Sequence, residues 1–157
     1  MNRKNKYRGQ RTDTKEWVYG NLLKLETDYF TDSNDTGFMW YIIPLKTNGS
    51  WSKEKLMLKF ISPCFEVIPE TVGQCTGLKD KNGKEIYEGD IIEKTYYSYH
   101  QPECSEIFKI IYNGLGFSFE HIKGRFYHTP FTEEIEVIGN IHDNPELIRR
   151  KNNGISK

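Results

Sequence analysis

The clearest pattern along the chain is a series of short apolar or alternating segments separated by turn residues. Segments of four to eight residues rich in β-branched and aromatic side chains are typical of β-strands. Gly20 interrupts the second segment and indicates a bulge or a bend. In the first half of the chain the pattern predicts strands over residues 7–11, 16–25, 38–43, 56–61 and 64–68.

The second half shows the same pattern at closer spacing, which favours a small sandwich or barrel. A polar, aromatic loop is expected over residues 96–106, and Asn144 followed by Pro145 indicates the start of a short terminal helix. Strands are expected over residues 74–80, 84–87, 91–92, 107–112, 117–122, 125–128 and 134–141. The fold expected for residues 74–141 is a five-stranded SH3-like barrel built from segments of this set.

The most specific turn signal is the dipeptide Asn82-Gly83. Both central residues of a type I′ turn need positive φ, and Asn-Gly meets that need better than most pairs. The sequence therefore predicts a hairpin with a type I′ turn at Asn82 and Gly83.

Together these patterns predict a mainly β fold, with α+β as the alternative. Residues 1–68 form an N-terminal strand-rich subdomain in this interpretation, and residues 69–148 form an SH3-like barrel subdomain with a short C-terminal helix. Residues 149–157 are a basic tail expected to fray. A chain of 157 residues is long enough to bury a core without covalent staples.

Composition strengthens the strand prediction and limits the function. The chain has no alanine, the best helix former, and 22 of its residues are aromatic. Lys and Arg total 22, as do Asp and Glu, so the formal net charge is zero. A zero net charge argues against a strong overall positive field of the kind that dedicated nucleic-acid binders use, and it favours self-association.

The three cysteines, Cys64, Cys75 and Cys104, are odd in number and no pair has CxxC spacing, which argues against a disulfide framework or a structural zinc site. We expect free thiols, no metal and no cofactor. The basic start of the chain has no apolar segment behind it, and no stretch approaches membrane-spanning length. A cytoplasmic location in a host cell, without membrane association, is therefore expected.

A basic run near the N-terminus is the main candidate binding site. Basic side chains interleaved with rings can follow a phosphate backbone and stack on bases. The alternative interpretation is a solvated edge strand that Lys and Arg protect from aggregation. The candidate nucleic-acid contacts are Lys6, Arg8, Arg11 and Lys15, with Tyr7 and Trp17 as the rings.

Catalysis is not expected. The histidines His100, His121, His128 and His142 lack the helical spacing of a metal site, although His121 and His128 could meet across adjacent strands. The charged stretch from Asp80 to Asp90 is interrupted by lysines and does not fit a calcium loop. No nucleophile, base and orienting group stand out as a set, so the sequence predicts no catalytic residues and no enzyme.

Three blocks of sequence resemble the YopX family of phage and prophage proteins. They are Lys6-Tyr7-Arg8-Gly9 with Trp17-Val18-Tyr19-Gly20, the long block from Pro69 to Ile91, and Glu136-Val137-Ile138-Gly139-Asn140-Ile141 with Asn144-Pro145-Glu146-Leu147. The resemblance implies a phage or prophage origin, a β-rich architecture and a homo-oligomer. It implies no catalytic residues.

The function expected from residues and resemblance together is a non-enzymatic phage accessory protein. It would self-associate and dock an unknown host or phage macromolecule. The alternative is a nucleic-acid-binding accessory factor that uses the basic N-terminal run and its aromatic residues.

Overall fold

The computed structural model describes residues 6–26, 38–44, 64–98, 101–122, 126–127 and 135–149. The chain divides into two compact units, Met1–Gln74 and Cys75–Lys157. The sequence placed this boundary between residues 68 and 69, whereas the observed division falls within a strand. The strand expected over residues 56–61 and the tail from residue 150 lie outside the described residues.

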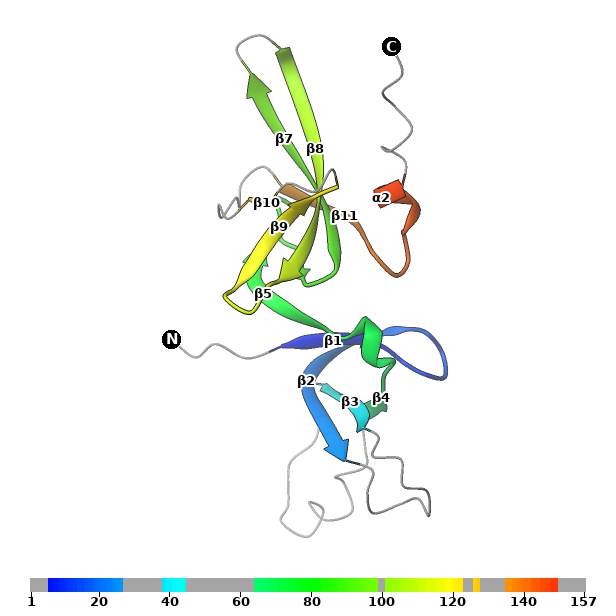
Figure 1. Ribbon diagram of the computed structural model, residues 1–157. Coiled ribbons are helices and arrows are strands. Elements are labelled where there is room, and N and C mark those ends of the chain that lie inside the picture. Colours follow the sequence, from blue (N-terminus) through cyan, green and yellow to red (C-terminus); the bar gives the residue numbers. More distant parts are fainter. Residues whose placement is uncertain are drawn as a thin grey trace. The chain divides into compact units, whose positions relative to one another are not determined.

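The described elements are mostly strands, which confirms the mainly β prediction (Figure 1). The helical elements are a 3-10 turn, η1 (Pro69–Thr71), and a short helix, α2 (Glu146–Arg149). The strands are β1 (Tyr7–Gln10), β2 (Trp17–Glu26), β3 (Phe38–Pro44), β4 (Phe65–Glu66), β5 (Gly73–Lys79), β6 (Glu85–Tyr87), β7 (Asp90–Ser98), β8 (Gln101–Tyr112), β9 (Phe117–His121), β10 (Phe126–Tyr127) and β11 (Ile135–Asn140).

The first unit is built on an antiparallel sheet in the order β4-β3-β2-β1. The other side of β1 pairs with the first two residues of β5, so β1 is an interior strand and the expected solvated edge strand is wrong. Gly20 keeps a regular register with both neighbours instead of forming a bulge. A Cβ there would lie 1.9 Å from the carbonyl oxygen of Ile43, so the glycine allows close approach of two backbones.

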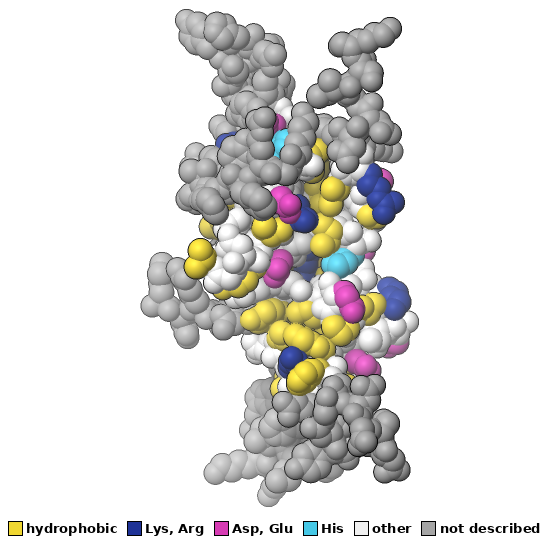
Figure 2. Space-filling view, in the orientation of Figure 1, with side chains coloured by type: hydrophobic (Ala, Val, Ile, Leu, Met, Phe, Trp, Pro, Cys, Tyr) yellow, Lys and Arg dark blue, Asp and Glu magenta, His cyan; other side chains and the backbone are white. Residues whose placement is uncertain are grey.

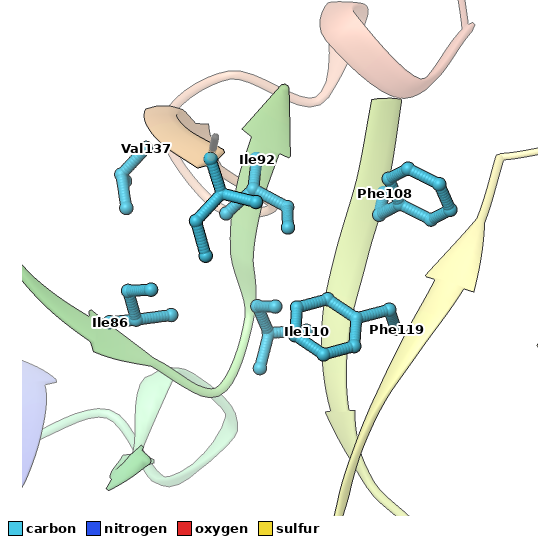
Figure 3. Packing of buried hydrophobic residues seen from close by; sticks show 7 residues of the cluster. Ile86, Ile92, Phe108, Ile110, Phe119 and Val137 are labelled. Atoms are coloured by element: carbon cyan, nitrogen blue, oxygen red, sulfur yellow. The ribbon is translucent and has the colours of Figure 1, made fainter. Parts of the chain in front are cut away.

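The second unit contains a five-stranded antiparallel sheet in the order β10-β9-β8-β7-β11, together with the hairpin β5–β6. Its core collects apolar side chains from β6, β7, β8, β9 and β11, several of which are drawn in Figure 3. Ile92 and Ile135 are almost fully buried, as expected for alternating inward positions. The core cluster comprises Ile86, Ile92, Phe108, Ile110, Phe119, Ile135 and Val137.

The polar loop expected over residues 96–106 is wrong. β7 and β8 pair in this region, with Thr95 opposite Ser105 and Ser98 opposite Gln101, and form a long hairpin (Figure 1). Backbone N–H and C=O groups make the ladder whatever the side chains are. A polar segment can therefore extend a hairpin whose register the apolar residues below already define.

The described pairings leave β10 and β11 at the two ends of the five-stranded sheet. β11 also contacts the turn between β5 and β6, where the backbone N–H of Lys81 donates to the carbonyl oxygen of Ile135 at 3.0 Å. SH3-like closure of this unit therefore stays a prediction. Asn144 precedes α2 as expected, but its side-chain oxygen accepts a hydrogen bond from the backbone N–H of Asn140 in β11.

A turn does join β5 to β6 at Asn82 and Gly83, but it is not type I′. Gly83 has a φ of 80°, while among the described non-glycine residues Lys15 alone has positive φ. The N–H of Gly83 donates to the carbonyl of Asp80, and the N–H of Asp80 donates to the carbonyl of Lys84. This arrangement is a type I turn followed by a left-handed glycine, in which one residue with positive φ is enough.

Candidate binding surfaces

An apolar groove lies in the second unit, between the β5–β6 hairpin and the β8–β9 hairpin. Its volume is about 270 Å³. Ile110 and Phe119, which face one another in Figure 3, form part of its floor and belong to the core cluster. The lining residues are Thr76, Leu78, Ile86, Ile110, Phe117, Ser118 and Phe119.

The two hydroxyl groups in the groove are already hydrogen bonded within the unit. Thr76 donates from Oγ1 to the carbonyl of Ile86 and accepts from the N–H of Leu78. Ser118 accepts from Nδ2 of Asn113 at 3.0 Å. None of the lining residues carries an ionisable side chain. The groove can therefore hold an apolar group, and its lining lacks the ionisable side chains that acid–base or nucleophilic catalysis uses.

The turn between β8 and β9 borders this groove and exposes apolar side chains. Leu115 is 98% exposed and Tyr112 is 49% exposed. The ring of Tyr112 meets the ring of Phe117 edge to face, with centroids 5.4 Å apart. Sequence reasoning passed over this site, although an apolar residue between Gly114 and Gly116 in a turn was a visible signal.

The predicted basic run does not form a single patch. Lys6 and Arg8 lie over the rings of Tyr19 and Trp17, at 5.9 Å and 4.7 Å from the ring centroids. Arg8 is only 5% exposed, so its guanidinium is not available to a phosphate at the surface. Trp17 is half-buried beneath it.

Arg11 and Lys15 lie elsewhere. Alternation along the chain directs Arg11 to the face opposite Arg8, and its guanidinium lies 4.4 Å from the ring centroid of Phe65. Arg11 also makes a two-point contact with Asp13, at 2.8 Å and 2.6 Å, which lowers the pKa of that carboxyl group. Lys15 sits in the β1–β2 turn with its Nζ 3.2 Å from the carbonyl of Thr12.

Basic side chains over rings recur elsewhere in the first unit. Nζ of Lys24 lies 3.6 Å from the ring centroid of Phe38 and 4.9 Å from that of Trp40. At such distances the electrons of the ring face attract the cation. Figure 2 shows basic side chains lying beside hydrophobic ones on the visible surface. The long basic side chains thus cover exposed ring surface in this unit.

The predicted turn at Asn82 and Gly83, which joins β5 to β6, is held by a buried carboxylate. Asp80 is 6% exposed, and its Oδ1 accepts from the N–H groups of Asn82 and Lys84 at 2.9 Å each. Burial by itself would raise the pKa of Asp80, but hydrogen bonds from the N–H groups of Val137, Lys84 and Asn82, with the charge of Lys84, outweigh it and lower the pKa. This role is structural.

Among the described residues, the remaining candidates are not grouped into a reactive centre. His121 is buried, with its ring edge-on to Phe108 and its Nε2 3.9 Å from Glu106, while His100 and His128 lie outside the described residues. Within the part of the chain that the structure describes, no three His, Cys, Asp or Glu residues are grouped to hold a metal ion. The described helices include none long and apolar enough to cross a membrane.

The fold and surfaces define a small, mainly β protein with two sheet-based units and an apolar groove. Residues 6–149 match the family described as YopX protein, which covers nearly the whole chain. The chain belongs to the YopX family.

A similar solved structure is the crystal structure of protein EF1440 from Enterococcus faecalis. It is 30% identical to this chain, covers 92% of it and 97% of the Enterococcus chain, and superposes with a TM-score of 0.47. A search of curated protein sequences finds no match.

Proposed function

We propose that this YopX-family protein is a non-enzymatic accessory protein of phage or prophage that self-associates and docks another macromolecule in the host cytoplasm. The observation that carries the proposal is the open apolar groove of the second unit, bordered by the exposed side chains of Tyr112 and Leu115. Apolar concave sites next to exposed apolar side chains are typical of protein contacts.

Two further features support association over catalysis. The groove has no ionisable lining residue, and its hydroxyls are hydrogen bonded internally. The formal net charge of zero removes the long-range repulsion that keeps many small proteins apart.

The test is static light scattering coupled to size exclusion over a micromolar concentration series. The expected result is a mass above 18.5 kDa that rises with concentration. A constant mass of one chain would overturn self-association. Affinity capture from phage-induced cells, with and without nuclease, then separates protein partners from nucleic acid, and nuclease-resistant capture supports protein docking.

Nucleic-acid binding is the second candidate, and one observation favours it. Lys6 with Tyr19 and Arg8 with Trp17 combine basic groups and rings on one face of the β1–β2 pair. Single strands bind to such combinations through stacking and phosphate contacts. Burial of Arg8 and pairing of Arg11 with Asp13 leave Lys6 and Lys15 as the surface phosphate contacts.

Two phosphate contacts predict a shallow salt dependence. The log–log slope of affinity against salt would be about −1.4 on single strands and about −1.8 on duplex. Replacing Lys6 and Lys15 by alanine should bring the slope near zero, while Lys109→Ala in the second unit should leave it unchanged. Absence of binding at low salt would eliminate this candidate.

A further inference from the structure

We propose that the apolar groove of the second unit receives Leu115 from a second copy of this chain, and that the exchange is reciprocal about a two-fold axis. This inference rests on the proposed self-association and names its contact. The occupant of the groove is then the β8–β9 turn of another copy.

Leu115 is an exposed apolar residue on a turn that hydrogen bonds hold in place. Its side chain is 98% exposed, yet the turn that carries it is held by several hydrogen bonds. Oδ1 of Asn113 accepts from the N–H of Leu115 at 3.1 Å and from the N–H of Gly116 at 3.2 Å. The N–H of Asn113 donates to the carbonyl of Gly116. A side chain fixed on a rigid turn loses little conformational entropy on docking.

The groove has the size and the chemistry to receive this side chain. Its volume of about 270 Å³ exceeds the roughly 150 Å³ with which an apolar cavity holds a benzene-sized group. Leu78, Ile86 and Phe117 offer apolar walls. The hydroxyls of Thr76 and Ser118 are used internally, so an aliphatic side chain leaves no polar group of the groove newly unsatisfied.

Leu115 and part of the groove lining lie on the same β8–β9 hairpin, which allows a two-fold exchange. Phe117 follows Leu115 by two residues and lines the groove, and the side chain of Asn113 also binds Ser118 in the groove wall. A projection and a recess on the same hairpin can be exchanged between two copies, each copy giving and receiving one leucine. Such an isologous contact closes after two subunits and does not continue into a fibre.

The contact is small compared with stable protein interfaces. A stable interface buries about 800 Å² on each partner, far more than one leucine and a groove provide. The groove contact alone therefore supports a weak, concentration-dependent dimer, and other surfaces would have to join it in a tighter assembly.

Sedimentation velocity from about 10 µM to about 1 mM tests the contact on the full chain. Leu115→Asp should raise the dimer dissociation constant at least about a hundredfold, because two leucine insertions are lost per dimer. The matched control is Leu25→Asp, which charges a 43% exposed leucine of β2 in the other unit and should leave dimerisation unchanged. An unchanged melting temperature of Leu115→Asp excludes a folding defect, as its exposure predicts.

Cross-linking tests the geometry independently. In a chain whose three cysteines are replaced by serine, copies with Leu115→Cys and copies with Leu78→Cys should form a mixed disulfide when combined. Dimers that persist in Leu115→Asp and give no mixed disulfide would overturn the groove contact while leaving self-association intact. A wild-type chain that stays monomeric throughout would overturn both and leave the groove to a different macromolecule.

Discussion

The carboxylate of Asp80 binds the backbone of Val137, 57 positions further along the chain. The N–H of Val137 donates to Oδ2 of Asp80 at 3.1 Å, while Oδ1 holds the N–H groups of Asn82 and Lys84 in the turn. One buried side chain therefore ties the β5–β6 turn to β11. Lys81 and Glu136 add an exposed ion pair of 2.6 Å beside this link.

Replacing Asp80 by asparagine should destabilise the second unit. The amide oxygen can keep the two turn hydrogen bonds, but the amide nitrogen would face the N–H of Val137, and both are donors. We expect a loss of about 1–3 kcal/mol in the free energy of unfolding, measured by urea denaturation. Lys81→Ala is the control, since loss of an exposed ion pair that solvent screens should cost much less than loss of a buried hydrogen bond. Equal losses in the two variants would contradict the central role of the carboxylate.

The stabilisation by Asp80 should depend on pH with a defined sign. The pKa of this carboxyl group is lower in the folded state than its ordinary value. A lowered pKa contributes stability that is complete above the unfolded pKa of about 3.9 and is lost as pH falls through the folded pKa. Denaturation curves of the wild type and Asp80→Asn should therefore converge in acid below about pH 4 and differ fully at neutral pH. A gap that widens in acid would show that the pKa is raised.

Gly83→Ala should destabilise the β5–β6 hairpin through backbone strain alone. Its φ is 80°, and a Cβ at this position would meet nothing within 4 Å. The left-handed conformation costs a residue with a Cβ about 1–2 kcal/mol. Gly116→Ala is the matched control, because a Cβ there also meets open space and the residue does not have positive φ. Chemical denaturation of both variants should show a loss only for Gly83→Ala, and Gly83→Val should lose at least as much.

Gly20→Ala should disrupt the first unit by a different mechanism. The added Cβ would collide with the backbone of β3 at Ile43, which a strand cannot avoid without giving up its register. We expect a loss of about 1–3 kcal/mol or more, with reduced strand signal in circular dichroism. Asn21→Ala changes an exposed neighbour on the same strand and should stay within about 0.5 kcal/mol. A Gly20→Ala chain as stable as the wild type would place the β2–β3 pairing in error.

Chelation should leave the protein's stability unchanged. The described residues contain no cluster of metal-ligating side chains, and the cysteine spacing does not fit a zinc site. The melting temperature should be the same with and without a strong chelator. A fall of several degrees would bring the cysteines and histidines back as ligands.

The positions of many strands follow from the local pattern of apolar and polar residues. The alternation of Ile135 and Val137 with polar neighbours placed both in the core, and the apolar run at residues 38–43 is strand β3. These predictions hold because burial of one strand face imposes a period of two on the sequence. The extension of β7 and β8 through residues 96–106 was predicted as a loop, because backbone pairing imposes no pattern on polar side chains.

The basic run that was the candidate binding site shows the same contrast between local sequence pattern and tertiary contacts. The basic run from Lys6 to Lys15 was visible in sequence, but only the fold placed Arg8 over Trp17 in a buried position and joined Arg11 to Asp13. Nothing in local sequence says whether a charge faces water or a ring. That choice depends on neighbours brought in by strand pairing.

Residue order and short-range chemistry are enough to predict the mainly β fold, the positions of most strands and turns, and membership of the YopX family. Three features became visible only in the folded chain: the buried link from Asp80 to β11, the interior position of β1, and the exposure of Leu115 beside an apolar groove. The groove is lined by β5, β6, β8 and β9, up to 43 positions apart between Thr76 and Phe119. Such a site arises from the packing of distant strands, and no local pattern encodes the shape that remains between them.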